Sequence, residues 1–382
     1  MQTSIIFVRE KRNKHSIRVI AAAFEQHFPD RDYTVCAPED LLASLKSISA
    51  RALILCSFNT SKVEEYFTLA DVVKLSFPKV VLACGGPHPT ARSADCLQHF
   101  DMACVGEGEL AIKDIVAAFD RGESLGLVIG KSLDDLDRFP VFPRRFMQFG
   151  PIEITRGCPG RCHYCQTPQL FQGKVRHRSV DAIVADVEFC LHSKRRQMDV
   201  RFITSDATFY EYNGAVNLAG IETLLSGVRN AVGADGRIFY GSFPSEFDPS
   251  RVSPELVELM KRYCDNSTVV IGLQSGSDKL LKLMNRRATV DDAERAATLL
   301  TNAGYDVVID LIFGLPYEDD KSLADTIRWI DAWKQKVTIH AHPFFPMPGS
   351  AWEHEQPSKV PEQLLRLLRS IEGSGKIFGK YL

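Results

Sequence analysis

The chain has 382 residues, of which 45% are hydrophobic and 25% are charged, and its formal net charge is −2. That length and apolar content are enough for two domains, or one large domain, with proper hydrophobic cores. A net charge near zero gives no electrostatic reason for nucleic acid or an anionic membrane to be the main partner. The first apolar run is too short for a signal peptide, and no stretch approaches the ~20 apolar residues of a membrane helix. We therefore expect a cytoplasmic protein with neither a nucleic-acid nor a membrane partner.

Residues 1–125 alternate short apolar runs with amphipathic segments. The alternation predicts βαβ units and a parallel, doubly wound sheet, which binds ligands at the carboxyl ends of its strands. The expected strands cover residues 4–8, 33–36, 52–56, 80–84 and 102–105, and the expected helices cover 16–27, 39–46, 62–75 and 109–119. Several cysteines lie within these apolar runs, which indicates buried free thiols rather than a disulfide framework.

Three of the expected strands end in unusual loops. Paired glycines allow a close approach of backbone to a ligand, and prolines stiffen a loop. Each of these sequences alone is common in a turn after a strand, but three such loops in succession are unusual. The loops are Ser57-Phe58-Asn59-Thr60, Gly85-Gly86-Pro87-His88 and Gly106-Glu107-Gly108.

Residues 126–150 contain Asp pairs, two Pro-containing turns and no clear hydrophobic period. We interpret them as a linker between two domains. The aromatic side chains within this stretch indicate that it packs against a domain rather than floating free.

Three cysteines follow the linker at C-x3-C-x2-C spacing: Cys158, Cys162 and Cys165. Structural zinc needs four nitrogen or sulfur ligands, usually from paired motifs, and no second cysteine pair exists. His163 lies on too tight a loop to complete a tetrahedron readily, and His177 offers only a lone partner. A four-iron cluster normally takes four thiolates, so three would leave one iron open to a small molecule. A zinc knuckle or a cluster of reduced thiols is the alternative.

Residues 151–345 alternate again between strands and helices. The expected strands cover residues 152–155, 200–203, 237–240, 269–273, 307–313 and 337–341. Six such units fit a partial (β/α)6 barrel, whose pocket opens at the strand C-termini. Residues 346–382 form an expected C-terminal helical extension, with a helical run over 361–372.

The cysteine motif, with Tyr164 just before the third cysteine, resembles the signature of the radical S-adenosylmethionine (SAM) superfamily. The succession of the three N-terminal loops resembles the cobalamin-binding domain placed ahead of many radical SAM domains. The resemblance implies a Rossmann-like cobalamin domain followed by a partial barrel, and three cofactors: a [4Fe-4S] cluster, SAM and cobalamin (methylcobalamin). The sequence has no D-x-H-x-x-G motif, so we expect cobalamin to bind without that motif's histidine.

The resemblance also implies roles for individual residues. Cys158, Cys162 and Cys165 would hold the cluster and would be catalytic. The residues expected to contact SAM are Tyr164, Arg178, Ser205, Asp206, Ser242, Gln274 and Ile312. Those expected to line the corrin pocket are Ser57, Phe58, Asn59, Thr60, Gly85, Gly86, Pro87, His88, Gly106, Glu107 and Gly108. The alternatives are a surface turn for Ser205 and Asp206, and a salt-bridged helix start for Arg178. Tyr317 departs from the glycine that relatives commonly have in G-L-P-G-E.

The activity that the resemblance implies is methylation of an unactivated sp3 carbon. A deoxyadenosyl radical takes hydrogen from the substrate, which then takes methyl from methylcobalamin. Among compact members, the chain resembles the methanogen enzymes that C-methylate a glutamine of methyl-coenzyme M reductase. The expected partners are a protein or peptide substrate and an electron donor such as ferredoxin or flavodoxin, with the enzyme a monomer. A non-methylating cyclase or rearranging enzyme, and a corrinoid or iron–sulfur sensor, remain alternatives.

Overall fold

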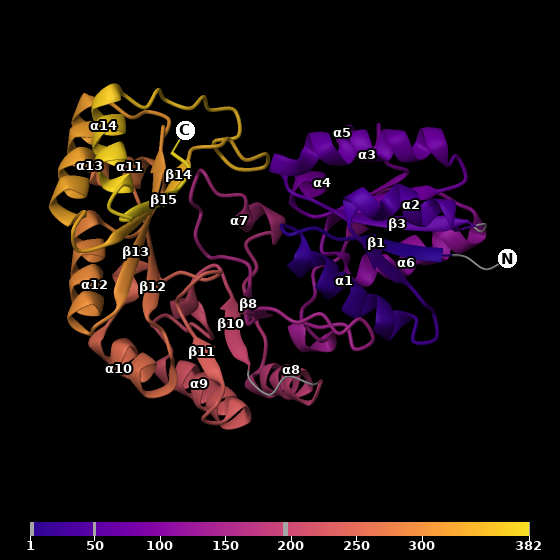
Figure 1. Ribbon diagram of the computed structural model, residues 1–382, viewed down its shortest axis with the longest axis horizontal. Helices are drawn as coiled ribbons and strands as arrows, with labels where there is room; N and C mark the ends of the chain where they lie inside the picture. The colour runs from indigo at the N-terminus through magenta and orange to yellow at the C-terminus, as the bar shows by residue number, and fades with distance from the viewer. Residues whose placement is uncertain (1–3, 49–50, 194–197, 382) are drawn as a thin grey trace. The chain divides into compact units, whose positions relative to one another are not determined.

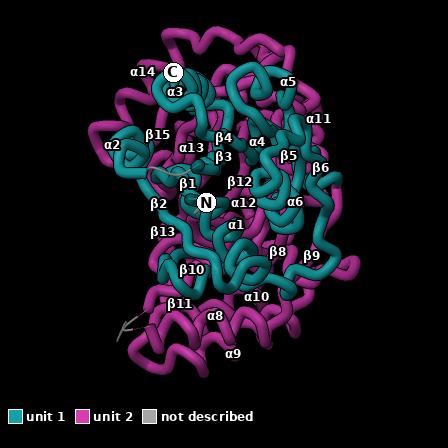
Figure 2. The backbone as a smooth tube through the Cα atoms, turned by 90° about the vertical axis from the view of Figure 1, so that its right-hand side faces the viewer, with its two compact units in different colours: residues 1–150, 169–172 teal, residues 151–168, 173–382 magenta. Residues whose placement is uncertain are grey.

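The computed structural model describes residues 4–48, 51–193 and 198–381 (Figure 1). The chain divides into two compact units, one formed by Met1–Gly150 and Gln169–Gln172 and the other by Pro151–Pro168 and Gly173–Leu382 (Figure 2). Within the described part of the chain, no helix combines the length and apolar character needed to cross a membrane. All ten cysteines are free thiols, as the sequence predicts.

The first unit is built on a six-stranded parallel sheet of order β2-β1-β3-β4-β5-β6. Its strands are β1 Ser4–Val8, β2 Thr34–Cys36, β3 Ala52–Ser57, β4 Val81–Gly85, β5 Met102–Gly106 and β6 Gly126–Gly130. Its α-helices are α1 Lys14–His27, α2 Leu41–Lys46, α3 Val63–Ser76, α4 Pro87–Ala91, α5 Ser93–Cys96 and α6 Gly108–Arg121. Short 3-10 turns cover Pro38–Asp40, Thr60–Lys62 and Leu136–Arg138.

Both faces of this sheet are covered, so the central strands are apolar without alternation. On one face, Leu53 packs in a core with Phe24 of α1 and Ile112 of α6. On the other face, its neighbour Ile54 packs in a second core with Leu45 of α2 and side chains of α3. The predicted doubly wound architecture is confirmed, and the strand order reverses between β1 and β3, where such sheets bind ligands.

Residues 126–150 are not simply a linker, which corrects the sequence prediction. Their first five residues form β6, which pairs in parallel with β5 from Met102↔Gly126 to Gly106↔Gly130. Leu127 and Ile129 of this edge strand are 49% and 65% exposed, so the strand lacks the buried pattern of its neighbours. The strand begins and ends with glycine, a residue typical of loops, which is why the sequence did not predict a strand here. Farther along, Phe142 is buried and lies under the guanidinium of Arg18 in the same unit.

The second unit alternates strands and helices, with helices such as α9, α10, α12 and α13 outside the strands (Figure 1). Its strands are β7 Ile152–Glu153, β8 Thr155–Arg156, β9 Arg176–His177, β10 Asp199–Ile203, β11 Arg237–Phe239, β12 Thr268–Gln274, β13 Asp306–Phe313, β14 Thr338–Pro343 and β15 Ile377–Gly379. Its helices are α7 Thr167–Leu170, which begins in this unit, α8 Val180–His192, α9 Leu218–Val232, α10 Pro254–Tyr263, α11 Asp278–Leu283, α12 Val290–Asn302, α13 Asp320–Trp333 and α14 Glu362–Glu372; 3-10 turns cover Ala207–Phe209 and Pro249–Arg251.

The strands form two parallel sheets, of order β11-β10-β7 and β12-β13-β14-β15. A bridge between Phe247 and Ile271, and a bond from the Val270 amide to the Gly241 carbonyl (2.9 Å), join them. Six strands therefore follow one another in chain order, as the partial barrel requires: β7, β10, β11, β12, β13 and β14. The predicted strand over residues 152–155 is broken in two: β7 pairs with β10, and β8 pairs antiparallel with β9.

The C-terminal extension is not purely helical. Its helix α14 buries Leu364, Leu368 and Ile371 on one face, which is the pattern the sequence shows. The three-residue strand β15 then adds to the edge of β14 in parallel. Only the neighbouring strand makes so short a segment a strand, so its sequence alone could not predict it.

Candidate active site

The Cys loop, defined here as residues 157–166, follows β8 and depends on two glycines. Gly157 has φ +90°, and a Cβ there would lie 1.9 Å from the Lys174 carbonyl oxygen, so the position tolerates only glycine. The Gly160 amide donates to Cys158 Sγ (3.4 Å). A Cβ on Gly160 would lie 3.2 Å from Cys158 Sγ and 3.8 Å from Cys162 Sγ. The loop therefore gathers thiols around a residue without a side chain.

Backbone contacts hold the Cys loop to the rest of the barrel. The backbone amide of His163 donates to the Met284 carbonyl (2.9 Å), and its Nδ1 donates to the Leu283 carbonyl (2.8 Å). The Trp352 amide donates to the His163 carbonyl (2.9 Å). His163 Nδ1 is thus engaged away from the thiols, and the three cysteines are the side chains that the loop itself offers to a metal.

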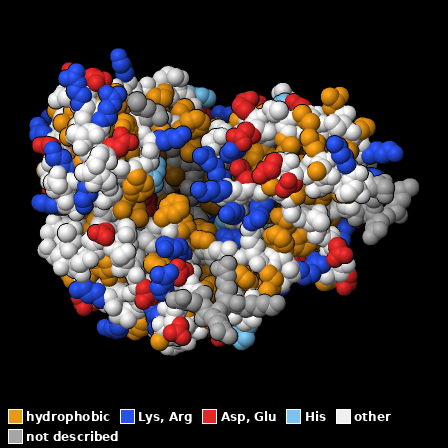
Figure 3. Space-filling view, in the orientation of Figure 1, with side chains coloured by type: hydrophobic (Ala, Val, Ile, Leu, Met, Phe, Trp, Pro, Cys, Tyr) orange, Lys and Arg blue, Asp and Glu red, His pale blue; other side chains and the backbone are white. Residues whose placement is uncertain are grey.

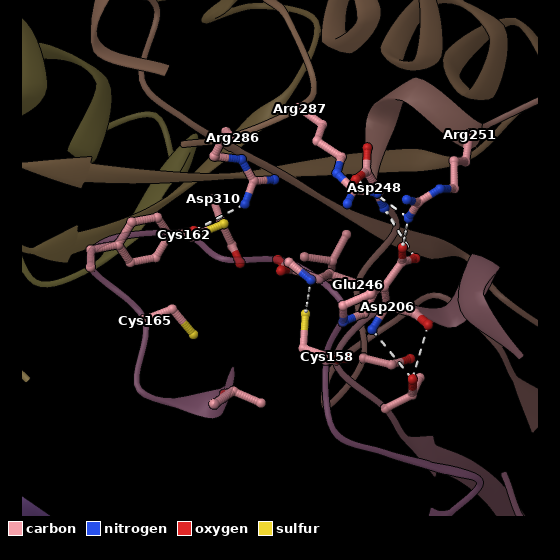
Figure 4. A pocket seen from close by; sticks show the side chains of 18 of the residues that line it. Cys158, Cys162, Cys165, Asp206, Glu246, Asp248, Arg251, Arg286, Arg287 and Asp310 are labelled. Carbon is pink, nitrogen blue, oxygen red and sulfur yellow. Dashed lines mark hydrogen bonds and ion pairs between the residues drawn. The ribbon is translucent and has the colours of Figure 1, made fainter. Parts of the chain in front are cut away.

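The thiols line a cavity of about 340 Å³ in the second unit. Figure 4 shows the cysteines on the Cys loop at one side and charged residues from the barrel strands and their loops at the other. Burial raises the pKa values of Cys158 and Cys162 above their usual range, and the Gly160 amide partly offsets this shift for Cys158. The free thiols of Cys158 and Cys162 are therefore protonated, and metal binding must release their protons.

Arg286 joins the Cys loop to the strands. Its Nη1 donates to the Tyr164 hydroxyl (2.9 Å) and its Nη2 donates to the Gly272 carbonyl. Burial alone would lower the pKa of Arg286, but Tyr164, Cys162 and Glu246 around it raise that pKa above its usual value. The guanidinium therefore stays charged beside the thiols.

Two carboxyl groups in the cavity have opposite protonation tendencies. Burial raises the pKa of Glu246 to about 8; nearby Asp310 adds to the shift and Arg286 opposes it. Burial also disfavours ionised Asp310, but hydrogen bonds from His340 and His342 bring its pKa down to about 2. The pKa of Glu246 is therefore raised while that of Asp310 is lowered, so Asp310 is the more readily ionised of the two.

In the first unit, the predicted loops meet at the carboxyl ends of β3, β4 and β5. Gly86 has φ +99°, and a Cβ there would lie 2.7 Å from Ser57 Oγ and 3.1 Å from the Phe58 carbonyl. Thr90 Oγ1 accepts from the Gly106 amide (3.1 Å) and donates to the Gly86 carbonyl (2.8 Å). The backbone of these loops is held so closely that side chains are excluded.

Asn13 fixes the end of β1 to the same edge. Its Nδ2 lies within hydrogen-bonding distance of the Val8 carbonyl (3.0 Å), the Ser57 carbonyl (2.9 Å) and the Tyr66 hydroxyl (3.0 Å). Ser57 Oγ donates to Ser16 Oγ (2.9 Å). The loop after β1 is thus tied to the loop after β3.

Residues 152–330 match the radical SAM superfamily, and residues 13–116 match the B12 binding domain. The chain contains a B12-binding domain followed by a radical SAM domain. Its cofactors are a [4Fe-4S] cluster, SAM and cobalamin. The site geometry fits them: three thiols that line one cavity suit a cluster that leaves one iron open, and glycines at 86 and 106 keep the loops after β4 and β5 close to neighbouring backbone at the edge of the sheet where such folds bind ligands.

Several known proteins resemble this chain. It is 32% identical over 190 residues to the ribosomal protein uS12 methylthiotransferase of Acetivibrio thermocellus, covering 46% of this chain and 38% of that protein. It is 22% identical over 330 residues to an uncharacterized methyltransferase of Pyrococcus horikoshii, covering 77% and 67%. The chain spans half or less of the length of the uS12 enzyme and of a putative methylthiotransferase of Methanocaldococcus jannaschii that is also among these relatives.

Two solved structures share the fold over nearly the whole chain. The radical SAM methyltransferase TsrM from Kitasatospora setae, with cobalamin and a [4Fe-4S] cluster bound, has a TM-score of 0.66 at 14% identity and covers 92% of this chain and 77% of its own. The cobalamin-dependent radical enzyme OxsB, with aqua-cobalamin and SAM bound, has a TM-score of 0.66 at 14% identity and covers 98% and 57%. They show that the chain shares their fold, and the family matches over residues 13–116 and 152–330 confirm the expected order of a cobalamin domain and a radical SAM domain.

The radical SAM cavity includes three of the seven residues predicted to contact SAM: Tyr164, Ser205 and Asp206. Ser205 Oγ donates to the Gly157 carbonyl (2.8 Å). Asp206 is paired with Arg251 Nη1 (2.5 Å) and accepts from the Thr208 hydroxyl (2.6 Å). The ammonium group of SAM, if bound at Asp206, would share the Asp206 carboxylate with the guanidinium of Arg251.

The other four predicted SAM residues are not among those lining this cavity, and their roles stay predictions. Arg178 is buried, and its Nε donates to the Glu153 carbonyl (3.3 Å). Ser242 Oγ accepts from Arg201 (3.4 Å). Gln274 is buried at the end of β12 with φ +78°, and Ile312 lies near the end of β13.

In the B12-binding domain, His88 is buried rather than presented from an open loop. Its Nδ1 lies 3.1 Å from Thr60 Oγ1, and its ring stacks on the Phe58 ring with 5.9 Å between the ring centroids. Burial lowers its pKa, so the imidazole is neutral. His88 lies in the short helix α4, and these contacts link that helix to the loop after β3.

Sequence reasoning missed Arg286, Arg251 and Asp310 as cavity residues. Asp310 carried a signal. Strand β13 begins with Asp306, and Asp310 is the one charged side chain in the apolar run VVIDLIF that follows. Arg286 stands in the pair Arg286-Arg287 after α11. Neither pattern shows that the two side chains meet the Cys loop, which lies more than 100 residues earlier.

Proposed function

We propose that this chain is a cobalamin-dependent radical SAM C-methyltransferase that methylates an unactivated sp3 carbon of a protein or peptide side chain. The observation that carries the proposal is the presence of a B12-binding domain together with a cavity in which the Cys loop offers three thiols. The full-fold similarity to TsrM and the match to a Pyrococcus horikoshii methyltransferase support methyl transfer.

The chain's own residues position the groups. Cys158, Cys162 and Cys165 would hold the cluster, and Tyr164, fixed by Arg286, would lie against SAM. When bound, the cluster and SAM supply a radical that abstracts hydrogen, and methylcobalamin supplies the methyl group. Polar groups that line the cavity would orient the bound groups.

The proposed target is a glutamine side chain of methyl-coenzyme M reductase, on the resemblance to methanogen enzymes described above. A protein substrate agrees with the match to an enzyme named for ribosomal protein uS12.

We propose ferredoxin or flavodoxin as the electron donor, and a monomeric enzyme. Figure 3 shows Lys, Arg, Asp and Glu side chains mixed over the visible surface, in keeping with a net charge of −2.

The test is an anaerobic assay with reconstituted protein, hydroxocobalamin, SAM and a reductant, using a peptide that contains the reductase glutamine. We expect deoxyadenosine, S-adenosylhomocysteine and a peptide heavier by one methylene group. Deoxyadenosine with an unmethylated but altered product would instead support a cyclase or rearranging enzyme. A peptide heavier by a methylthio group would support a methylthiotransferase, as in the relatives of that name.

A Cys162→Ala variant tests the cluster assignment within the same assay. It should lose the brown iron–sulfur absorption and all deoxyadenosine formation. The matched control is Cys264→Ala, because Cys264 is a thiol of the same unit that does not line the cavity. If Cys162→Ala still cleaves SAM, the three-thiol assignment is wrong. A mass-spectrometric comparison of the host proteome with and without the protein would identify the target independently.

A further inference from the structure

Two histidines and an aspartate share one face of the barrel's parallel strands. Asp310 of β13 pairs in register with His340 of β14, and Ile312 pairs with His342. Because side chains alternate along a strand, His340 and His342 point to the same side, together with Asp310. Leu311 and Ala341, which lie between them, point the other way and are buried.

The polar atoms of these three side chains converge. His340 Nδ1 lies 2.9 Å from Asp310 Oδ1 and 3.1 Å from His342 Nε2, and His342 Nε2 lies 3.9 Å from Asp310 Oδ1. All three ligand atoms lie within 4.8 Å of one another. The three polar atoms thus face one another across a small space. A cation placed between the three atoms would satisfy every lone pair at once.

We propose that Asp310, His340 and His342 bind one divalent transition-metal ion. Zinc lies about 2.0–2.2 Å from imidazole nitrogen and carboxylate oxygen, so the ligand atoms of a tetrahedral site are about 3.3–3.6 Å apart. The three distances here, 2.9, 3.1 and 3.9 Å, bracket that spacing. Two histidines and one carboxylate are a donor set that proteins use for zinc and for iron(II), with coordination positions left open. The sulfur ligands of the Cys loop are a different donor set, suited to a different metal.

The surroundings allow a metal to enter and hold the ligands in place. The side chain of His342 is 42% exposed and that of His340 is 22% exposed. Phe378 of β15 stacks on the His340 ring, with 4.5 Å between ring centroids and planes 13° apart, and so fixes the orientation of the imidazole. Asp310 also lines the cavity of the Cys loop, so the proposed metal would lie at the edge of that cavity.

The experiment measures zinc binding by the cluster-loaded protein under anaerobic conditions. Protein stripped of loosely bound metal is incubated with zinc sulfate and passed through a desalting column, and zinc and iron per chain are determined by mass spectrometry. The wild type should retain one more zinc per chain than His342→Gln, His340→Gln and Asp310→Asn. His354→Gln is the matched control, because His354 is an exposed histidine of the same unit that does not belong to the proposed zinc site.

Iron content and circular dichroism show whether each variant is folded and loaded. His342→Gln is the decisive variant, because its half-exposed side chain can change with little effect on packing. Equal zinc in the wild type and His342→Gln overturns the proposal and leaves the three residues as a hydrogen-bonded group. Loss of the same zinc in His354→Gln also overturns it. The measurement uses neither SAM nor substrate, so it stands apart from the proposed methyl transfer.

Discussion

Arg286 donates to the Tyr164 hydroxyl at 2.9 Å, and so ties the Cys loop to the segment that follows α11. The same guanidinium donates to the Gly272 carbonyl of β12. Two chain segments separated by more than 100 residues are therefore joined by one partly buried cation, directly beside a thiol that is expected to hold the cluster.

Replacement of Arg286 by Met should destabilise the protein by about 2 kcal/mol, because it leaves a hydroxyl and a carbonyl without their donor. It should also lower iron content after reconstitution. Urea unfolding under anaerobic conditions measures the first effect and iron analysis the second. Arg287→Met is the control, since Arg287 is exposed at the rim of the same cavity. Equal losses in the two variants would contradict a special role for Arg286.

Gly86→Ala should destabilise the B12-binding domain by about 1–3 kcal/mol and weaken hydroxocobalamin binding. The new Cβ would meet Ser57 Oγ at 2.7 Å, at a backbone φ of +99°. Gly126→Ala separates the two causes, because Gly126 has φ +59° but a Cβ there would have no other atom within 4 Å. That variant should cost about 1 kcal/mol and leave cobalamin binding unchanged. Urea midpoints and visible absorption of bound cobalamin provide the readouts.

Glu318 should make stability depend on pH. Burial, reinforced by the neighbouring Asp319 carboxylate, raises the pKa of Glu318 from 4.5 to about 7. A raised carboxyl pKa means that the folded state keeps a proton that the unfolded state loses, so stability falls as the pH rises from about 4.5 to about 7. Glu318→Gln should remove part of that fall, of the order of 1–2 kcal/mol. Thermal unfolding at several pH values measures it. Glu258→Gln, at an exposed position, is the control; parallel curves for the wild type and Glu318→Gln would refute the assignment.

Tyr317 occupies a backbone conformation that suits glycine. Its φ is +65°, at the position where relatives of the proposed family have Gly, and its ring lies 5.8 Å from that of Trp352. Tyr317→Ala keeps the strained backbone and loses the ring contact, whereas Tyr317→Gly also relieves the strain. The Gly variant should therefore be more stable than the Ala variant by about 1 kcal/mol. Calorimetry of both variants checks the order, and a more stable Ala variant would disprove the strain.

Much of the fold was predictable because local patterns carry it. The apolar runs of β3 and β4 are buried on both faces, and such runs predict parallel central strands. The strand β6 was not predictable, since Leu127 and Ile129 face solvent and only β5 gives them a partner. Likewise, β15 exists because β14 has an open edge, not because of its three residues.

The sequence by itself determined the local motifs of this protein: a C-x3-C-x2-C loop, and one polar and two glycine-containing loops after parallel strands. Their resemblance to known families implies the cofactors, because such motifs are local properties of the chain. Tertiary structure decided which side chains surround those groups. Arg286, Glu246 and Asp310 come from three separate elements, and His340 and His342 meet Asp310 only through the register of β13 and β14. Contacts of that kind depend on how distant strands pair, which no local pattern encodes.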